Sequence, residues 1–392
     1  MKRPTKILAL IVFAQFCCTS LWFAGNGVMA DLILNFNLND GALGHLTSAV
    51  QFGFISGTLS FAFFTLSDRF SPSKVFFYCA LAGATFNLGA TLQNNSLESL
   101  LLYRFLTGFS LAGIYPVGMK IASDYFKKGL GRSLGFLVGA LVIGTAFPHL
   151  LKDLTGAGGL HWRMVLIFTS IIAGLGGILI LLFVPDGPHR RKLKKLDLTI
   201  FFKVFRNTKF RAAAFGYFGH MWELYAFWAF VPVILASYKE IHPEAGFSIP
   251  LISFLIIGLG GIACMAGGFI SEKKGTKRTA ASALFLSGLC CFLSPLVFLM
   301  DSEVSLIAFL IFWGLVVVAD SPLFSTLVAQ NAPVEVKGTA LTIVNSIGFA
   351  ITIVSIQFLN FINDYFNTLY LYTILGIGPV LGLMALYRKK HS

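Results

Sequence analysis

The chain has 392 residues, of which 56% are hydrophobic and only 12% are charged. A composition with so little polar surface excludes an ordinary soluble globular protein and indicates a protein of the lipid bilayer. The net charge of +13 could suggest nucleic-acid binding. However, twenty-five of the 30 lysine and arginine residues fall at the two chain ends and in alternate segments between apolar runs. The positive-inside rule makes that side cytoplasmic, and we expect no nucleic-acid partner.

A bilayer core of roughly 30 Å needs about 20 apolar residues per helix, and twelve such runs follow one another. We predict spans at residues 7–30, 44–66, 75–93, 99–123, 133–151, 163–184, 211–236, 248–270, 279–299, 304–329, 338–362 and 366–387. The first run is interpreted as an uncleaved span because it continues to about Ala30 and similar runs follow it. Both termini are then cytoplasmic.

A long polar segment, 185–210, separates the sixth span from the seventh and contains the basic run 189–195. It predicts two six-helix bundles, 1–184 and 211–392, joined by a cytoplasmic linker. Apolar residues among its bases indicate either a helix lying in the inner interface or a solvated connector attracted to anionic lipid.

The sequence has no clear signature of a metal site, a disulfide, a nucleotide site or a catalytic site. The six cysteines all fall inside apolar runs without CxxC spacing, so we predict neither a zinc site nor disulfides. No glycine-rich stretch has the GK[ST] ending of a phosphate-binding loop, and no nucleophile–base pair is recognisable. We therefore expect no cofactor, no metal and no enzymatic activity.

A short charged loop occurs twice, between spans two and three and again between spans eight and nine. The first copy contains Asp68 and Arg69, and the second contains Glu272 and Lys273. The two acids are about half the chain apart, which indicates an internal repeat.

These loops resemble the signature glycine-x-x-x-acid-base-x-glycine-base-base of the major facilitator superfamily, and the resemblance extends over the whole chain. The second copy is nearly complete, whereas Phe64 replaces the first glycine of the first copy. Arg104 and Gly108 in span four, and Trp162-Arg163 at the start of span six, also resemble the family. The resemblance implies an all-α integral membrane protein of twelve transmembrane helices, with two bundles related by pseudo-two-fold symmetry. It also implies a monomer that transports by alternating access.

In that family the acid of the loop lies against the start of a helix in the other half. We therefore expect Asp68 with Arg69, and Glu272 with Lys273, to latch the inner gate, since a carboxylate is stabilised near a helix N-terminus. The alternative is that the loops only orient the chain through their positive charge.

Four ionisable residues lie deep in predicted spans: Lys120, His220, Glu223 and Asp320. Charges at this depth are costly and mark functional sites. In the resembled family, spans one, four, seven and ten line the central cavity, and all four residues fall on three of these spans. We predict that Glu223, with His220 one turn before it, carries a coupling proton, because carboxyl groups away from water hold protons more readily and histidine titrates near neutral pH. The alternative is a static hydrogen-bond or ion-pair network.

Asp320 precedes Ser321-Pro322, which interrupts span ten, so it either binds ligand at a broken helix or caps a kink. Lys120 either contacts a substrate anion, pairs with Glu223 or Asp320, or extends to the inner interface. Arg104 either faces the cavity, extends to the outer interface or packs. The remaining predicted substrate contacts are aromatic or polar: Trp22, Asn26, Gln51, Tyr115, Trp222, Tyr225, Trp228 and Asn345. His149 is predicted to be a surface residue, and the glycines of span five, including Gly135 and Gly144, are predicted to allow close packing.

The sequence thus predicts a secondary transporter in the plasma (inner) membrane that moves a small polar or anionic solute together with a proton. The stretches 67–72 and 115–120 loosely resemble the cyanate, nitrate and nitrite branch of the superfamily, although the arginines that nitrate carriers place in spans two and eight are absent. One alternative is an exporter of lipophilic compounds. Another is a receptor or scaffold that has the fold without transport.

Overall fold

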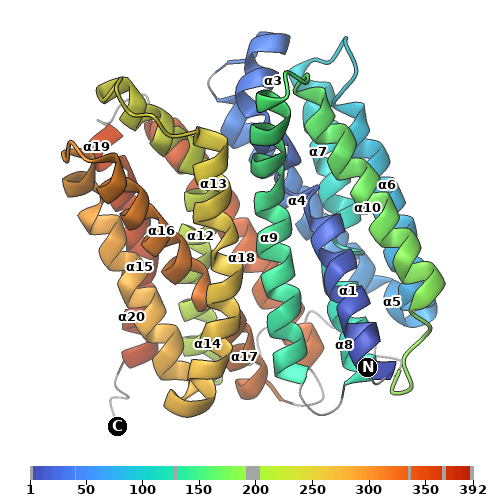
Figure 1. Ribbon diagram of the computed structural model, residues 1–392. Helices are drawn as coiled ribbons and strands as arrows, with labels where there is room; N and C mark the ends of the chain where they lie inside the picture. The colour runs from blue at the N-terminus through green and yellow to red at the C-terminus, as the bar shows by residue number, and fades with distance from the viewer. Residues whose placement is uncertain are drawn as a thin grey trace. The chain divides into compact units, whose positions relative to one another are not determined.

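The computed structural model describes residues 3–39, 41–126, 130–190, 204–333, 337–363 and 368–388. In this part of the chain the secondary structure is entirely helical (Figure 1). The first half contains α1 (Arg3–Thr19), α2 (Ala24–Gly27), α3 (Met29–Phe36), α4 (Ala42–Phe63), α5 (Leu66–Arg69), α6 (Pro72–Gly89), α7 (Leu97–Leu111), α8 (Tyr115–Tyr125), α9 (Leu130–Ala157) and α10 (Arg163–Phe183). The second half contains α12 (Thr208–Ile241), α13 (Ile249–Gly258), α14 (Gly260–Lys274), α15 (Thr276–Phe298), α16 (Glu303–Ala319), α17 (Ser321–Asn331), α18 (Lys337–Ile362), α19 (Thr368–Leu371), η2 (Tyr372–Gly376) and α20 (Ile377–Tyr387).

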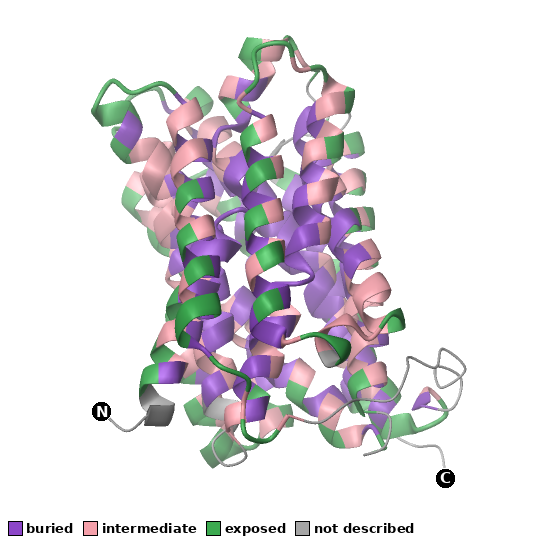
Figure 2. Cartoon of the chain, turned by 90° about the vertical axis from the view of Figure 1, so that its right-hand side faces the viewer, coloured by how far each residue is buried: buried purple, intermediate pink, exposed green. Residues whose placement is uncertain are grey.

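The prediction of an all-α membrane fold is confirmed. Nine of the described helical segments are long and apolar enough to cross a membrane, and two shorter apolar helices lie at 6–19 and 372–387. Many large apolar side chains, such as Phe52, Leu182 and Leu296, are exposed on single helices. Figure 2 shows exposed and buried residues on different sides of individual helices. Water would penalise so much exposed apolar surface, whereas acyl chains would not.

Several predicted spans are broken helices. The predicted span 7–30 is divided among α1, α2 and the start of α3, and the predicted span 99–123 is divided between α7 and α8. Span ten is interrupted at Asp320, where α16 ends and α17 begins with Pro322 near its start. A break leaves backbone groups without helical partners in the bilayer, so each break needs compensating contacts within the protein.

The chain divides into two compact units. One consists of residues 1–196 with 253–258, and the other of 197–252 with 259–392. In the N-terminal unit α4 packs on α7, α6 on α10, and α1 on both α9 and α10. In the C-terminal unit α12 packs on α18 and α20, and α16 packs on α14 and α15. Residues 191–203, which are half of the predicted linker, lie outside the described residues.

Glycine allows α4 and α7 to approach closely. A Cβ added to Gly53 would meet the carbonyl oxygen of Phe105, and one added to Gly108 would meet that of Val50. In α9 the prediction for the glycines holds at Gly144, where a Cβ would lie 2.5 Å from the oxygen of Phe16. It is wrong at Gly135, where no described atom lies within 4 Å of an added Cβ.

Gly108→Ala should therefore lower the free energy of unfolding by about 1–3 kcal/mol, since the extra methyl group forces two backbones apart. Gly135→Ala is the matched control, because it adds the same methyl group to open space and removes a glycine from a helix. Thermal unfolding in detergent micelles measures both. Equal stabilities for the two variants would contradict the packing role of Gly108.

Candidate functional site

Glu223 lies inside the C-terminal unit, where three side chains bind it. Its carboxylate on α12 is fully buried. Ser287 Oγ on α15 donates to Oε2 over 2.8 Å. Trp313 Nε1 on α16 donates to Oε1 over 2.7 Å, and Cys291 Sγ also faces Oε1 at 3.3 Å. The carboxylate therefore joins three helices of one unit.

The hydrogen bonds around Glu223 are compatible with two protonation states. Ser287 Oγ also lies 3.1 Å from the carbonyl oxygen of Leu284. If Glu223 Oε2 carries a proton, that proton can be donated to Ser287, whose own hydroxyl proton can turn to Leu284. A hydroxyl group is both a donor and an acceptor and rotates to suit its neighbours, so neither state leaves a buried group unpaired. The site can hold or release a proton with one hydroxyl rotation.

His220 and Asp320 form a second buried pair in the same unit. The Nδ1 atom of His220 lies 2.8 Å from Oδ1 of Asp320, and both side chains are at most 1% exposed. The other nitrogen of His220, Nε2, and the other oxygen of Asp320, Oδ2, have no hydrogen-bond partner among the described residues. Buried polar atoms usually have a hydrogen-bond partner, such as a protein group or water. Nε2 of His220 and Oδ2 of Asp320 are therefore available to bind water or another polar partner.

The prediction that the Asp320 side chain caps the segment after it is wrong. Asp320 occupies the N-cap position of α17, but its side chain makes no capping hydrogen bond. Its carboxylate turns to His220 on α12 instead. His220 and Glu223 therefore share one helix but bind different partners. His220 binds Asp320 at the break in span ten, and Glu223 binds Trp313, two turns earlier in the same span.

Arg104 is buried at the break in span one. Its side chain is only 3% exposed, and Nη1 donates to the carbonyl oxygen of Leu21 over 3.1 Å. Nη2 donates to the carbonyl oxygen of Trp22. These carbonyls follow the last turn of α1, where they have no helical partner and where a positive charge is favourable. For Arg104 the structure favours packing over extension to the interface.

The N-terminal unit holds further buried polar groups near the same break. Asn26 Nδ2 donates to Thr47 Oγ1 over 2.8 Å. Gln51, one turn further along α4, is fully buried, and neither its oxygen nor its nitrogen has a hydrogen-bond partner in the described part of the chain. Trp22 packs on Phe54 with ring centroids 4.7 Å apart. The structure thus brings three predicted contacts, Trp22, Asn26 and Gln51, to one face of α4.

The prediction that His149 is a surface residue is wrong. It is buried, not on the surface, and its Nε2 has no hydrogen-bond partner within the described ranges. Thr145, one turn earlier on α9, is buried and has an unpaired hydroxyl by the same measure. The i, i+4 spacing of Thr145 and His149 beside Pro148 was the available signal, since it places two polar groups on one face of an apolar helix.

The remaining predicted contacts lie in different surroundings. Trp222 donates from Nε1 to the carbonyl oxygen of Ile374 over 3.4 Å, so it faces η2 within its own unit. The ring of Tyr225 lies 5.2 Å from that of Trp228 and 5.3 Å from that of Phe349. Three other predicted contacts are half-buried: Tyr115, Lys120 and Asn345.

The repeated loop is exposed in both copies. Arg69, Glu272 and Lys273 are exposed, whereas the side chain of Asp68 lies outside the described residues. The first copy is anchored to the end of span six, because Ser71 Oγ donates to Asp186 over 2.6 Å and Arg190 donates to the carbonyl oxygen of Phe70 over 2.7 Å. The latch prediction involves the other half of the chain and stays a prediction.

Twelve predicted spans, two helical units and buried charges inside them are typical of a multi-pass membrane transporter. The sequence model of the Major Facilitator Superfamily matches residues 11–356. The chain belongs to this superfamily.

Comparisons with individual proteins agree with the superfamily. The chain is 25% identical over 239 residues to the MFS transporter PfmaC of Pestalotiopsis fici, covering 53% of this chain and 44% of that one. It is 28% identical over 181 residues to the 4-hydroxybenzoate transporter PcaK of Pseudomonas aeruginosa, covering 42% and 39%. The matched region spans less than half the length of these relatives. A bacterial homologue of the human lysosomal transporter Spinster has the same fold, with a TM-score of 0.72, 16% identity, and coverage of 98% of this chain and 95% of that chain.

Proposed function

We propose that this protein moves a small polar or anionic organic solute across the plasma (inner) membrane by alternating access and uses a proton as the coupling ion. The proposal assigns six helices to each of two bundles, residues 1–184 and 211–392, joined by a cytoplasmic linker at 185–210. Both termini are assigned to the cytoplasm because the basic residues collect at the chain ends and in alternate loops. We propose that the protein works as a monomer.

The buried amides support a polar solute. Gln51 is fully buried with both polar atoms unpaired, and Asn26 Oδ1 is unpaired in the same part of the described structure. Unpaired buried amide atoms are unfavourable unless water or a ligand binds them. Because Trp22 lies on the same face, we include organic acids with a ring in this class. The first solute to test is 4-hydroxybenzoate, the compound named for the PcaK relatives.

The hydrogen-bond exchange at Ser287 carries the proposal of proton coupling. Glu223 is buried with donors for its ionised form and an acceptor for its protonated form. A static carboxylate requires only the donors. A carboxylate that alternates between states also needs the acceptor, and Ser287 with Leu284 supplies it. His220, one turn away on α12, is the second proton-binding group.

Glu223→Gln should lower solute accumulation driven by a pH gradient in reconstituted liposomes at least tenfold. Exchange of internal for external solute should continue. The amide has the shape of the carboxyl group but takes up no proton. Ser287→Ala should weaken accumulation and spare exchange, since it removes the acceptor for the protonated form.

Glu240→Gln is the matched control, because Glu240 lies on the same helix but is exposed. It should accumulate solute as the wild type does. Wild-type uptake that does not respond to the pH gradient, or accumulation by Glu223→Gln at the wild-type level, would refute the proposed coupling.

A further inference from the structure

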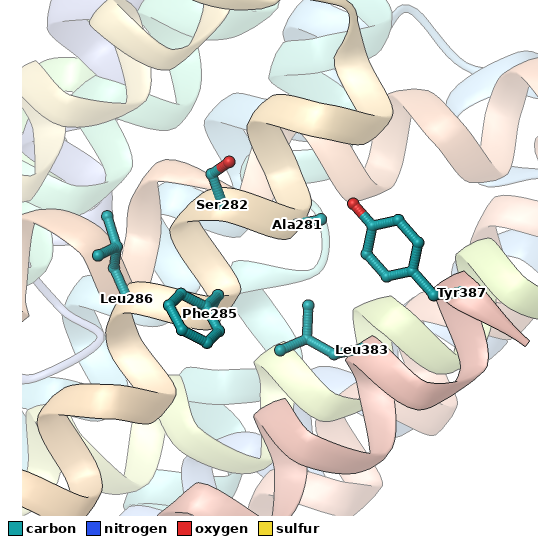
Figure 3. A pocket seen from close by; sticks show the side chains of 6 residues that line it. All are labelled: Ala281, Ser282, Phe285, Leu286, Leu383 and Tyr387. Carbon is teal, nitrogen blue, oxygen red and sulfur yellow. The ribbon is translucent and has the colours of Figure 1, made fainter.

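A groove opens between α15 and α20 in the C-terminal unit. Its volume is about 530 Å³, and it is lined by Ala281, Ser282, Phe285, Leu286, Leu383 and Tyr387 (Figure 3). Figure 3 shows the Phe285 ring and the Leu286 side chain along α15, with Leu383 and Tyr387 facing them from α20. Most of the lining is apolar, so the groove suits a hydrocarbon chain better than a polar solute.

The lining residues continue directly into basic residues at one end. On α15, Lys277, Ala281 and Phe285 follow one another at intervals of four, so they form one row along the helix. Arg278, Ser282 and Leu286 form the neighbouring row with the same spacing. The apolar groove therefore has two cations one turn from its lining.

Tyr387 connects the second helix to the same basic end. The Nζ atom of Lys277 lies 5.0 Å from the centroid of the Tyr387 ring, a cation–π distance. Arg388, the next residue, is exposed. Lys277, Arg278 and Arg388 thus gather where α15 begins and α20 ends, with the hydroxyl groups of Ser282 and Tyr387 close by in the lining.

The position along the helices fits one leaflet of a bilayer. Leu286 is ten residues beyond Thr276, the first residue of α15, which corresponds to roughly 15 Å of helix. Half of a hydrocarbon core of roughly 30 Å has the same depth. The groove therefore begins at a basic membrane boundary and ends near the bilayer centre, and Phe285 and Tyr387 are more than half exposed.

We propose that this groove binds one anionic phospholipid. An acyl chain lies along Phe285, Leu286 and Leu383, and the phosphate binds Lys277 and Arg278. The charges are complementary, since the lining carries no acid and the end of the groove carries bases, and basic sites between transmembrane helices on the cytoplasmic side suit anionic head groups. The first turn of α15 adds the partial positive charge of a helix N-terminus.

Thermal unfolding of the detergent-purified protein tests this site with phosphatidylglycerol and phosphatidylcholine of identical acyl chains. A lipid that binds only the folded protein raises Tm with concentration. We expect phosphatidylglycerol to raise Tm and phosphatidylcholine to have little effect. The double variant Lys277→Ala/Arg278→Ala should need at least tenfold more phosphatidylglycerol for the same rise.

The matched control is Lys6→Ala/Lys74→Ala, which removes two exposed bases from the N-terminal unit. Its Tm should rise with phosphatidylglycerol as that of the wild type does. An equally weakened response in this control would show that general surface charge causes the effect, and would overturn the proposal. Leu383→Trp, which fills the groove, should also weaken the response. Glycerol phosphate alone should not raise Tm, and a full response to it would show a phosphate site without a lipid chain.

Discussion

Arg104→Leu is expected to lower the free energy of unfolding by roughly 3 kcal/mol and to abolish transport. Arg104 supplies the two donors that satisfy the carbonyl oxygens of Leu21 and Trp22 at the break in span one. A buried carbonyl left without a donor costs about 1–3 kcal/mol, and leucine leaves two of them. Unfolding of the purified variant in detergent, followed by temperature or denaturant, measures the loss.

Arg104→Lys should give an intermediate result. A lysine ammonium group keeps the charge and has three N–H donors, but it lacks the rigid planar fork with which the guanidinium group binds both carbonyls, so it should satisfy them less well. Arg206→Leu is the control, because it removes an exposed arginine from the same chain. The role assigned to Arg104 would fail if Arg104→Leu unfolded at the same temperature as Arg206→Leu.

The contacts of Arg104 also explain how a broken helix persists in a bilayer. The backbone N–H groups of Leu21 and Trp22 donate to carbonyl oxygens of α1, but their own carbonyl oxygens need other donors, and no water is available in the hydrocarbon core. Arg104 on α7 supplies these two hydrogen bonds from a neighbouring helix. Since Trp22 and Asn26 lie at this break, the same contacts hold two proposed substrate contacts in position.

The sequence predicted the spans well because long apolar runs are a strong signal. The predicted limits 163–184 and 338–362 differ by one residue at one end from α10 and α18. The break at Asp320 was also recognisable, since proline interrupts helical hydrogen bonds. The break near Trp22 was missed, because no proline marks it and the contacts that stabilise it come from Arg104, more than eighty residues away in the chain. Gly25 and Gly27, which follow Trp22 closely, were the available signal.

The environments of the buried charges were harder to predict. The sequence placed His220 and Glu223 on one helix, one turn apart, but their partners come from α15, α16 and the break before α17. Helical spacing shows which residues share a face, but it does not show which helix that face contacts. His149 was misjudged for a similar reason, since its position near the outer end of its predicted span suggested exposure while packing buries it.

Single and double variants of the His220–Asp320 pair should distinguish a structural role of the pair from a role in transport. His220→Phe leaves the Asp320 carboxylate buried without its partner, and Asp320→Leu leaves the histidine in the same condition. Breaking a buried pair costs about 3–5 kcal/mol, so each single variant should be strongly destabilised. The double variant removes both polar groups at once, so it should be about as stable as the wild type and clearly more stable than either single variant.

Transport by the stable double variant then separates the two roles. If the pair only fills the break in span ten, the double variant should accumulate solute as the wild type does, because Glu223 and its donors are intact. If His220 holds the proton in part of the cycle, the double variant should exchange solute but lose accumulation, and this is the result we expect. His45→Phe, at an exposed histidine, controls for the loss of an imidazole group. Full accumulation by the double variant would remove His220 from the proposed mechanism and leave Glu223 as its proton-binding group.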